Sequence, residues 1–376
     1  MADYKKVMKT VLIVLLLLTG LLMALGPQIT KYTQGKYYKK FYGAEEINPA
    51  DLKDCPVSFR IKGMTRMSYD KQYFQPAALQ MVAAKHGIRQ DIGYFNFLMG
   101  FTYGVFYRSD MPAPMFTNDP ILGFKYAAPY LGLKMRFFTT DDRDVFIKAV
   151  KFHVSRNHPV IIELDAGALR GETVFLVHPE VIAGYSERGF EYLETDSKSR
   201  PGTGTGVLTT SSDSIVAAVL SQSKAFMSPR RFSIIIFEPA GEKKTDLREV
   251  FKQNGESLIG KKYGVVSVMG TGSFALQQFS AALKKKGGAG GLSLIEPAPY
   301  TRADNASFLL EYFPGDEDIK KAAADLKEAG LKHGKVLKLL KAADKAKAEE
   351  ASGLVSEAAA HEKSAGEIFL KKAGEK

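Results

Sequence analysis

The sequence predicts an α+β domain followed by a mainly helical C-terminal domain, and three observations predict it. First, short apolar runs typical of strands lie at residues 160–164, 180–185, 190–194 and 232–237. Second, these short strands around one helix fit an antiparallel sheet better than a parallel, doubly wound one. Third, the chain is rich in Ala, Lys and Glu from residue 316 onward, which is typical of amphipathic helices.

Helices are predicted near residues 75–86 and 141–154, and over residues 212–221. The second begins near Asp141 and Asp142, and carboxylates at that position cap backbone N–H groups and match the helix dipole. We therefore predict four parts: a signal anchor or transmembrane segment at 1–30, a basic and aromatic linker at 31–56, the α+β domain at 57–240, and the helical domain at 245–376.

The first thirty residues predict an N-terminal hydrophobic helix. Lysines precede an apolar run of about seventeen residues at positions 10–26, close to the lower limit for spanning a bilayer. A cleavage site is poorly defined because Pro27 follows the small residues that would form it. We expect a single-pass anchor in the cell membrane with the body outside the cytoplasm, in the periplasm. Secretion after cleavage of a signal peptide is the alternative.

Lysines and aromatic residues are interleaved between residues 31 and 42. Both side-chain types find partners at the level of lipid headgroups, so this segment suits a collar at the membrane surface. A linker that is simply basic is the alternative reading. Charge alone gives no clear orientation, because the lysines on the two sides of the apolar run are similar in number.

Composition excludes several classes of function. The chain has 376 residues, 45% hydrophobic and 25% charged, which is ordinary for a globular protein with room for two domains. Its net charge of +11 comes from lysines spread along the tail and the segment after the apolar run. No helix-turn-helix or zinc-finger pattern accompanies that charge, so nucleic-acid binding is not expected. The six histidines lack ligand spacing, so we expect no metal and no cofactor.

Residues 73–82 have the pattern of a helix that carries a catalytic cysteine at its first turn. Unpaired N–H groups and the helix dipole favour a thiolate at that position. Here the position of the cysteine is occupied by Phe74, and Gln75 and a Pro-Ala-Ala-Leu run follow it. The helix is therefore predicted without its nucleophile.

The partners of such a nucleophile follow in the expected chain order. His178 opens an apolar strand that ends in Gly184 and Tyr185, and Asp196 ends the next strand. Histidine and aspartate on neighbouring antiparallel strands can orient an imidazole against a nucleophile. We predict His178 as the base and Asp196 as the residue that orients it. Taken singly, a histidine at a strand end and a carboxylate at a turn are the ordinary alternatives.

Residues 66–238 resemble the peptidase superfamily that contains the bacteriocin-processing double-glycine peptidases, and more specifically the butirosin biosynthesis protein H-like family. The resemblance includes Asp91 and the Gly- and aromatic-rich segment from Gly93 to Tyr107. It extends to the helical C-terminal part through Tyr263-Gly264 and residues 276–283 and 302–311.

The resemblance implies a papain-like cysteine-peptidase fold and thioester or peptide chemistry, such as acyl transfer from a carrier protein to an amine. His178 and Asp196 match the base and its orienting residue, but Phe74 does not match the nucleophile. We therefore expect a disabled site and a binding role, with a peptide or an acyl chain as ligand. Tyr73, Gln75 and Tyr103 are the expected binding residues.

Two other functions stay open. One is an active acyltransferase or amide hydrolase that uses a different nucleophile, for which the candidates are Cys55, Ser68 and Tyr69. The other is nucleotide binding, because the glycine-rich residues 270–275 lie between strand-like residues 265–269 and 292–296 and imitate a dinucleotide-binding unit. A second Gly-rich segment at 200–206 lacks the lysine of a phosphate-binding loop, which makes it an ordinary loop.

Three apolar stripes with helical spacing follow residue 316. Gly330 and Gly334 separate the first two, and we expect them to interrupt the helix. The third stripe runs from Leu354 to Phe369. Such helices either pack on the body as a hairpin or offer a docking surface to a protein partner.

Overall fold

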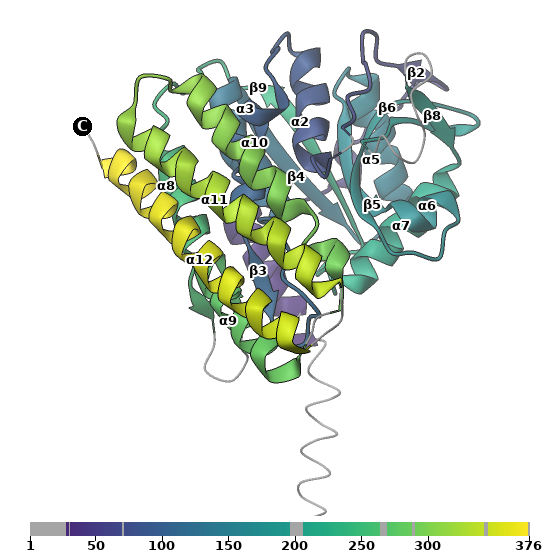
Figure 1. Cartoon of the computed structure of the whole chain (residues 1–376). Helices are drawn as coiled ribbons and strands as arrows, with labels where there is room; N and C mark the ends of the chain where they lie inside the picture. The colour runs from purple at the N-terminus through teal and green to yellow at the C-terminus, as the bar shows by residue number, and fades with distance from the viewer. Residues whose placement is uncertain are drawn as a thin grey trace, which may run out of the picture. The chain divides into compact units, whose positions relative to one another are not determined.

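The computed structural model describes residues 28–29, 31–69, 71–195, 206–263, 269–287, 290–341 and 345–374. The described chain forms two compact units. Unit 1 comprises Met1–Lys62, Arg136–Leu193 and Val207–Ile236, and unit 2 comprises Gly63–Met135, Glu194–Gly206 and Phe237–Lys376. The fold is α+β, as predicted, with a mixed sheet and many helices (Figure 1).

Unit 1 is built on the main sheet, in which the strand order is β1-β4-β9-β5-β6-β7-β8 and β2 pairs with β6. The pairs β5–β6, β6–β7 and β7–β8 are antiparallel, but β1 lies parallel to β4, so the expectation of a purely antiparallel sheet is corrected. The strands are β1 Glu45–Glu46, β2 Phe59–Arg60, β4 Leu133–Thr140, β5 Val160–Asp165, β6 Val177–Ser186, β7 Gly189–Leu193, β8 Val207–Thr210 and β9 Phe232–Pro239.

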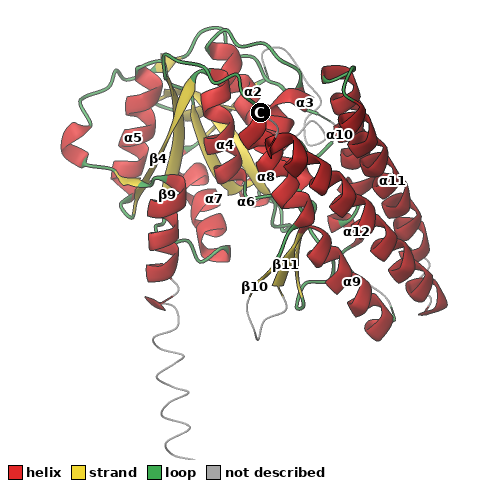
Figure 2. Cartoon of the chain, turned by 90° about the vertical axis from the view of Figure 1, so that its left-hand side faces the viewer, coloured by secondary structure: helices red, strands yellow, loops and turns green. Residues whose placement is uncertain are grey.

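The four strands predicted from apolar runs are present as β5, β6, β7 and β9. All six residues of β5 are buried, because this central strand is covered on both faces by helices. Figure 2 shows α5 (Arg143–Ser155) and α7 (Ser212–Ala225) on opposite sides of the sheet. The side chain of Asp142 caps α5 by accepting hydrogen bonds from the backbone N–H groups of Asp144 and Val145, at 2.8 and 3.0 Å.

The described N-terminal part of unit 1 is helical at residues 31–37 and continues as a π-helical turn, η1, at Tyr38–Tyr42. Tyr38 and Tyr42 pack edge-on against Phe137 of β4, with ring centroids 5.6 and 5.4 Å apart. This segment is thereby fixed to the sheet. The predicted hydrophobic helix lies mostly at residues 1–27, outside the described residues. No helix in the described part of the chain is long and apolar enough to cross a bilayer.

Unit 2 contains a helical bundle and a small antiparallel sheet of order β10-β11-β3. The helix α12 packs against α8, α9 and α11, and α10 packs against α11, so that these helices lie side by side in Figures 1 and 2. Its elements are α2 Phe74–Lys85, α3 Ile92–Met99, η3 Phe101–Tyr103, β3 Phe106–Arg108, α4 Pro120–Ala127, η4 Ala128–Leu131, α8 Arg248–Ile259, β10 Lys262–Tyr263, β11 Met269–Thr271, α9 Gly272–Lys286, η5 Leu292–Leu294, α10 Pro297–Tyr312, α11 Glu317–Leu340 and α12 Lys345–Gly374.

One expectation for unit 2 is wrong. The helix α11 runs through Gly330 and Gly334 without interruption. A Cβ atom on Gly330 would lie 2.9 Å from the carbonyl oxygen of Pro299, so this glycine permits close packing against α10 and does not end the helix. Residues 292–296, which only the nucleotide-binding alternative takes as a strand, form the 3-10 turn η5 and the turn that leads into α10.

A fully buried charged network joins three helices of unit 2. Arg302 of α10 donates two hydrogen bonds to the carboxylate of Glu362 on α12, from Nε at 2.8 Å and from Nη2 at 2.9 Å. Nε2 of His333 on α11 lies 3.1 Å from Oε1 of the same carboxylate. None of the three side chains is more than 1% exposed, so the network is shielded from water.

The carboxylate of Glu362 is ionised in the folded protein. Burial alone would raise its pKa, but the Arg302 charge and the hydrogen bonds from His333 and Arg302 outweigh burial and lower the pKa to about 2. Burial lowers the pKa of His333, although Glu362 opposes that shift. His333 is therefore neutral near pH 7 and donates its Nε2–H to the carboxylate.

Replacing Arg302 alone should destabilise the protein strongly. The substitution Arg302→Met leaves the Glu362 carboxylate buried without its cation, which we expect to cost about 3–5 kcal/mol of unfolding free energy. Urea unfolding of the full chain in detergent, followed by circular dichroism, measures this. The double variant Arg302→Met, Glu362→Leu is the matched control, and it should recover most of the loss. Equal instability of both variants would contradict the role given to the ion pair.

Acid should remove the contribution of Glu362 to stability. Its folded-state pKa of about 2 lies below its ordinary value of 4.5, so the unfolded chain binds the proton first as the pH falls. The stabilisation is complete above pH 4.5 and is lost between there and about pH 2. The pH dependence of urea unfolding should be shallower over this interval in Glu362→Gln, whereas parallel curves would assign the acid sensitivity to other carboxylates.

Candidate functional site

The helix α2 begins where the sequence predicts, with Phe74 as its first residue. Tyr73 is the N-cap residue but makes no side-chain cap hydrogen bond, and its carbonyl oxygen accepts from the backbone N–H of Ala77 at 2.8 Å. Pro76 is tolerated here because a first-turn residue needs no intrahelical donor. Phe74 is half-buried and occupies the predicted position of the nucleophile.

The loop before α2 is held by α10 within unit 2. Nζ of Lys71 lies 2.7 and 2.9 Å from the two carboxylate oxygens of Asp304, and the Tyr73 hydroxyl donates to the same carboxylate at 2.9 Å. The backbone N–H of Gln72 donates to the hydroxyl of Tyr300 at 3.1 Å. These contacts fix the direction in which the chain enters the helix.

Tyr73 remains a neutral hydroxyl at physiological pH. Burial raises the pKa of Tyr73 well above its ordinary range, and the nearby Asp304 charge and its hydrogen bond raise it further. A hydroxyl that stays protonated and donates to a carboxylate acts as a structural group. It does not supply a phenolate for nucleophilic attack.

Two predicted binding residues of unit 2 carry buried polar atoms that lack a partner. Oε1 of Gln75, in the first turn of α2, and the hydroxyl of Tyr103, in η3, accept or donate no hydrogen bond among the described residues. Tyr103 has no exposed surface, and its ring packs between Phe97 and Phe369. Gln75 is also buried and follows Phe74 at the start of α2.

His178 is the second residue of β6 in unit 1, and its side chain is buried. It pairs with Leu164 of β5. Side chains alternate between the two faces of a strand, so Glu180, which is fully buried, lies on the same face as His178. Glu180 is not among the predicted site residues, although it follows His178 by two residues in the same apolar segment.

Asp165 is a second buried carboxylate near this strand end, but it lies on the other face. It pairs with Val177, one residue before His178, and its Oδ2 accepts from the Ser221 hydroxyl of α7 at 2.6 Å. Its Oδ1 accepts from the backbone N–H groups of Ala168 and Leu176, at 3.2 and 3.1 Å. Burial tends to raise the pKa of Asp165, but these hydrogen bonds lower it overall. Asp165 is therefore a capping residue of α6 (Ala166–Arg170).

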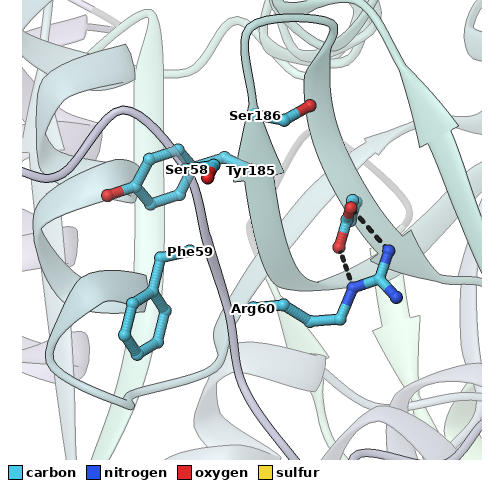
Figure 3. Close-up of a pocket in the computed structure, with 6 residues that line it drawn as sticks. Ser58, Phe59, Arg60, Tyr185 and Ser186 are labelled. Atoms are coloured by element: carbon cyan, nitrogen blue, oxygen red, sulfur yellow. Dashed lines mark hydrogen bonds and ion pairs between the residues drawn. The ribbon is translucent and has the colours of Figure 1, made fainter.

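Unit 1 has an open hollow at the opposite end of β6, lined by Ser58, Phe59, Arg60, Tyr185, Ser186 and Glu191 (Figure 3). Two hydrogen bonds of 2.5 and 2.6 Å join Arg60 to the carboxylate of Glu191, so the two charges neutralise each other. A Cβ atom on Gly184 would lie 3.1 Å from the carbonyl oxygen of Phe59, and the glycine thus lets β2 approach β6 closely. None of the predicted site residues that the structure describes lines this hollow.

The predicted site residues are thus distributed over the chain as follows. Tyr73, Phe74, Gln75 and Tyr103 belong to unit 2, and His178 belongs to unit 1. Asp196 lies outside the described residues. The arrangement of base, orienting residue and nucleophile position therefore stays a prediction. No group of three His, Cys, Asp or Glu side chains in the described part of the chain could hold a metal ion.

The contact between Asp304 and the loop before α2 gives a stability prediction. Asp304→Ala removes the acceptor of the buried Tyr73 hydroxyl, and we expect a loss of about 1–3 kcal/mol in unfolding free energy. Asp304→Asn is the control, because its amide oxygen still accepts from Tyr73 while the partly exposed ion pair with Lys71 is lost. That pair is worth about 0–1 kcal/mol. Equal losses in urea unfolding would show that the charge, and not the hydroxyl bond, holds the loop.

The comparison with known proteins adds no assignment. No protein-family model matches the chain, and no curated protein matches it.

Proposed function

We propose that this chain is a membrane-attached protein with a cysteine-peptidase-like domain that has lost its nucleophile, and that it acts by binding a peptide or an acyl chain. In this proposal it serves as a non-catalytic subunit of a complex. His178 and Asp196 are the inherited base and orienting residue. Phe74 occupies the position that the nucleophile would take.

The observation that carries the proposal is the start of α2. A side chain at the first turn of a helix meets unpaired N–H groups and the positive end of the helix dipole, which is the setting that activates a thiol. Here that residue is Phe74, whose phenyl ring offers no nucleophilic atom. Its neighbours Tyr73 and Gln75 supply a protonated hydroxyl and an amide, neither of which replaces a thiolate.

Other candidate nucleophiles are placed unfavourably. Cys55 lies in a loop of unit 1, and its thiol contacts the carbonyl oxygen of Lys53 at 3.6 Å and the hydroxyl of Ser155 at 3.8 Å. Neither contact supplies a positive charge or the N-terminus of a helix, the settings that activate a thiol. Tyr69 donates to Oε1 of Gln80 at 2.5 Å, and burial raises the pKa of its hydroxyl. Ser68 is half-buried and precedes α2 by more than one helical turn.

Binding is supported by Gln75. A buried polar atom without a partner costs about 1–3 kcal/mol, and a ligand that supplies a donor can recover this cost. The Oε1 atom of Gln75 accepts hydrogen bonds, so it suits the N–H group of a peptide or of an amide-linked acyl chain. The contacts of Lys71 and Tyr73 with Asp304 fix the loop before α2, and they would hold this acceptor in place without a ligand.

The nucleotide-binding alternative lacks support in the geometry of unit 2. A dinucleotide-binding unit needs two parallel strands joined by a helix. The strand β11, which leads into α9, is antiparallel to both β10 and β3. The second predicted strand is the turn η5, and Glu296 is the N-cap residue of α10.

Restoring the nucleophile tests the proposal. The full chain carrying Cys55→Ser is treated with thiol- and hydroxyl-directed acylating probes, and we expect no His178-dependent labelling. Adding Phe74→Cys should create a reactive thiol at the start of α2. Replacing His178 with Ala in that variant should slow labelling by about 10²–10⁴-fold if it acts as the base. Intact-protein mass spectrometry measures the rates.

Two outcomes would count against parts of the proposal. Labelling of the otherwise unmodified chain that disappears with His178→Ala would establish an active acyltransferase or amide hydrolase with another nucleophile. Labelling of Phe74→Cys that does not change with His178→Ala would remove His178 from the site. An exposed control, Glu187→Cys in the Cys55→Ser background, gives the reactivity of an ordinary surface thiol.

A further inference from the structure

Four apolar side chains of unit 1 project into water from two adjacent connections, and we call them the apolar patch: Val174, Phe175, Phe226 and Met227. Their exposed fractions are 58%, 44%, 51% and 59%. The first two precede β6, and the last two follow α7. The rings of Phe175 and Phe226 lie 6.1 Å apart, so the two connections form one surface. Large apolar side chains gathered in this way mark an interaction surface.

The apolar patch adjoins the N-terminal helix of unit 1. Nε2 of Gln34 donates to the carbonyl oxygen of Phe226 at 3.3 Å, and a Cβ atom on Gly35 would lie 3.8 Å from Cβ of Pro229. Figure 2 shows this helix below β9, with the end of α7 beside it. The patch and the helix therefore belong to the same end of unit 1.

The helix itself exposes residues of the same kind. Ile29 and Tyr32 are more than half exposed, and Nζ of Lys36 lies 4.5 Å from the centre of the Tyr32 ring. Apolar and aromatic side chains with lysines beside them suit the headgroup layer of a bilayer, where rings are half-buried and amines meet phosphates. The helix and the apolar patch, which meet at Gln34 and Phe226, thus share this composition.

The apolar patch lies a short distance along the chain from the end of the apolar run. Gln34, which contacts Phe226, follows residue 26 by eight residues, or ~12 Å at the rise of an α-helix. The apolar run of residues 10–26 ends just before residue 28. The headgroup region on each side of a bilayer is roughly 5–8 Å deep. An anchor ending at residue 26 would therefore place the apolar patch within a few ångströms of the headgroup region.

The charges around the apolar patch favour an anionic surface. The exposed lysines Lys31, Lys36, Lys39 and Lys40 lie along the N-terminal segment, and Lys224 precedes Phe226. The nearest carboxylate in sequence to Phe175 is Glu172, which pairs with Arg170 at 3.3 Å. Each lysine near an anionic membrane contributes about 1 kcal/mol of attraction.

The backbone of Met227 supports the same reading. Its φ is +49°, a left-handed conformation that glycine or asparagine adopts more readily. A non-glycine residue there costs about 1–2 kcal/mol. Met227 thus exposes an apolar side chain to water at a position where a glycine would be less strained. This is expected if the side chain inserts into a lipid surface.

We propose that the apolar patch, together with the N-terminal helix, docks unit 1 onto an anionic lipid surface. This inference rests on the proposed membrane attachment and adds a second, non-covalent contact between the folded body and the bilayer. Phe175, Phe226 and Met227 insert among the headgroups, and the lysines contact the lipid phosphates.

The test uses the full chain in vesicles with Cys55→Ser as background. Met227→Cys is labelled with bimane, and Glu187→Cys is the matched control. Glu187 is exposed and follows Val177 of β6 by ten residues, ~33 Å along the strand from the apolar patch. Vesicles contain phosphatidylcholine and phosphatidylglycerol with a nitroxide-labelled lipid, and a second set contains phosphatidylcholine alone.

Flotation tests membrane attachment, and quenching tests the docking surface. We expect the chain to float with the vesicles and bimane at Met227→Cys to be quenched at least threefold more than at Glu187→Cys, with weaker quenching without phosphatidylglycerol. A chain that floats but shows equal quenching at both positions would overturn the docking surface alone. A chain that does not float would overturn membrane attachment and the docking surface together. Equal quenching of Met227→Cys in both lipid mixtures would overturn the contribution of the lysines.

Discussion

The buried pair between Arg302 and Glu362 is the interaction on which unit 2 depends. A guanidinium and a carboxylate without exposed surface repay their desolvation only when their geometry is good, and here two parallel hydrogen bonds and His333 provide it. Because the three residues belong to α10, α12 and α11, satisfying one carboxylate fixes the relative register of three helices. Apolar stripes alone allow such helices to slide, whereas a buried charge tolerates one position.

The same turn of α10 also orders the segments around α2. Asp304, two residues after Arg302, holds the loop before α2, and Asn305 accepts from the side-chain amide of Asn96 at 2.9 Å and from the hydroxyl of Thr102 at 3.0 Å. Three polar residues within four positions thus connect the C-terminal bundle to the start of α2 and to η3. The C-terminal helices are therefore part of the support of the candidate binding site, and not an independent appendage.

Sequence periodicity was sufficient to find the elements that bury one face or both. The strands β5, β6, β7 and β9 and the helices α2, α5 and α7 begin and end close to the predicted residues, because apolar runs and caps such as Asp142 are local signals. Gly330 misled the prediction, since the helix propensity of glycine is local but its contact with Pro299 is not. The same limit applies to the nucleotide-binding alternative, because the apolar residues of η5 pack within unit 2 without forming the strand that it requires.

The candidate site was predictable in part. The start of α2 and the buried strand position of His178 follow from the local pattern, but the partners of the polar residues do not. Arg302 and Glu362 are separated by 60 positions, and Tyr73 and Asp304 by 231, with no spacing that would connect them. Glu180 lay within reach of sequence reasoning, because an acid two residues after a histidine in a buried strand must share its face.

The packing of η1 on the sheet determines how unit 1 is connected to its N-terminal segment. A flexible linker lets a folded domain sweep a large volume, so it can meet partners far from its point of attachment. Here Tyr38 and Tyr42 are stacked edge-on against Phe137, and the segment that follows the apolar run continues as part of the folded unit. Unit 1 is therefore fixed to this segment and does not pivot on a flexible linker. The fold sets the orientation of unit 1 relative to the N-terminal segment. A partner can therefore bind only to the surfaces that this orientation leaves accessible.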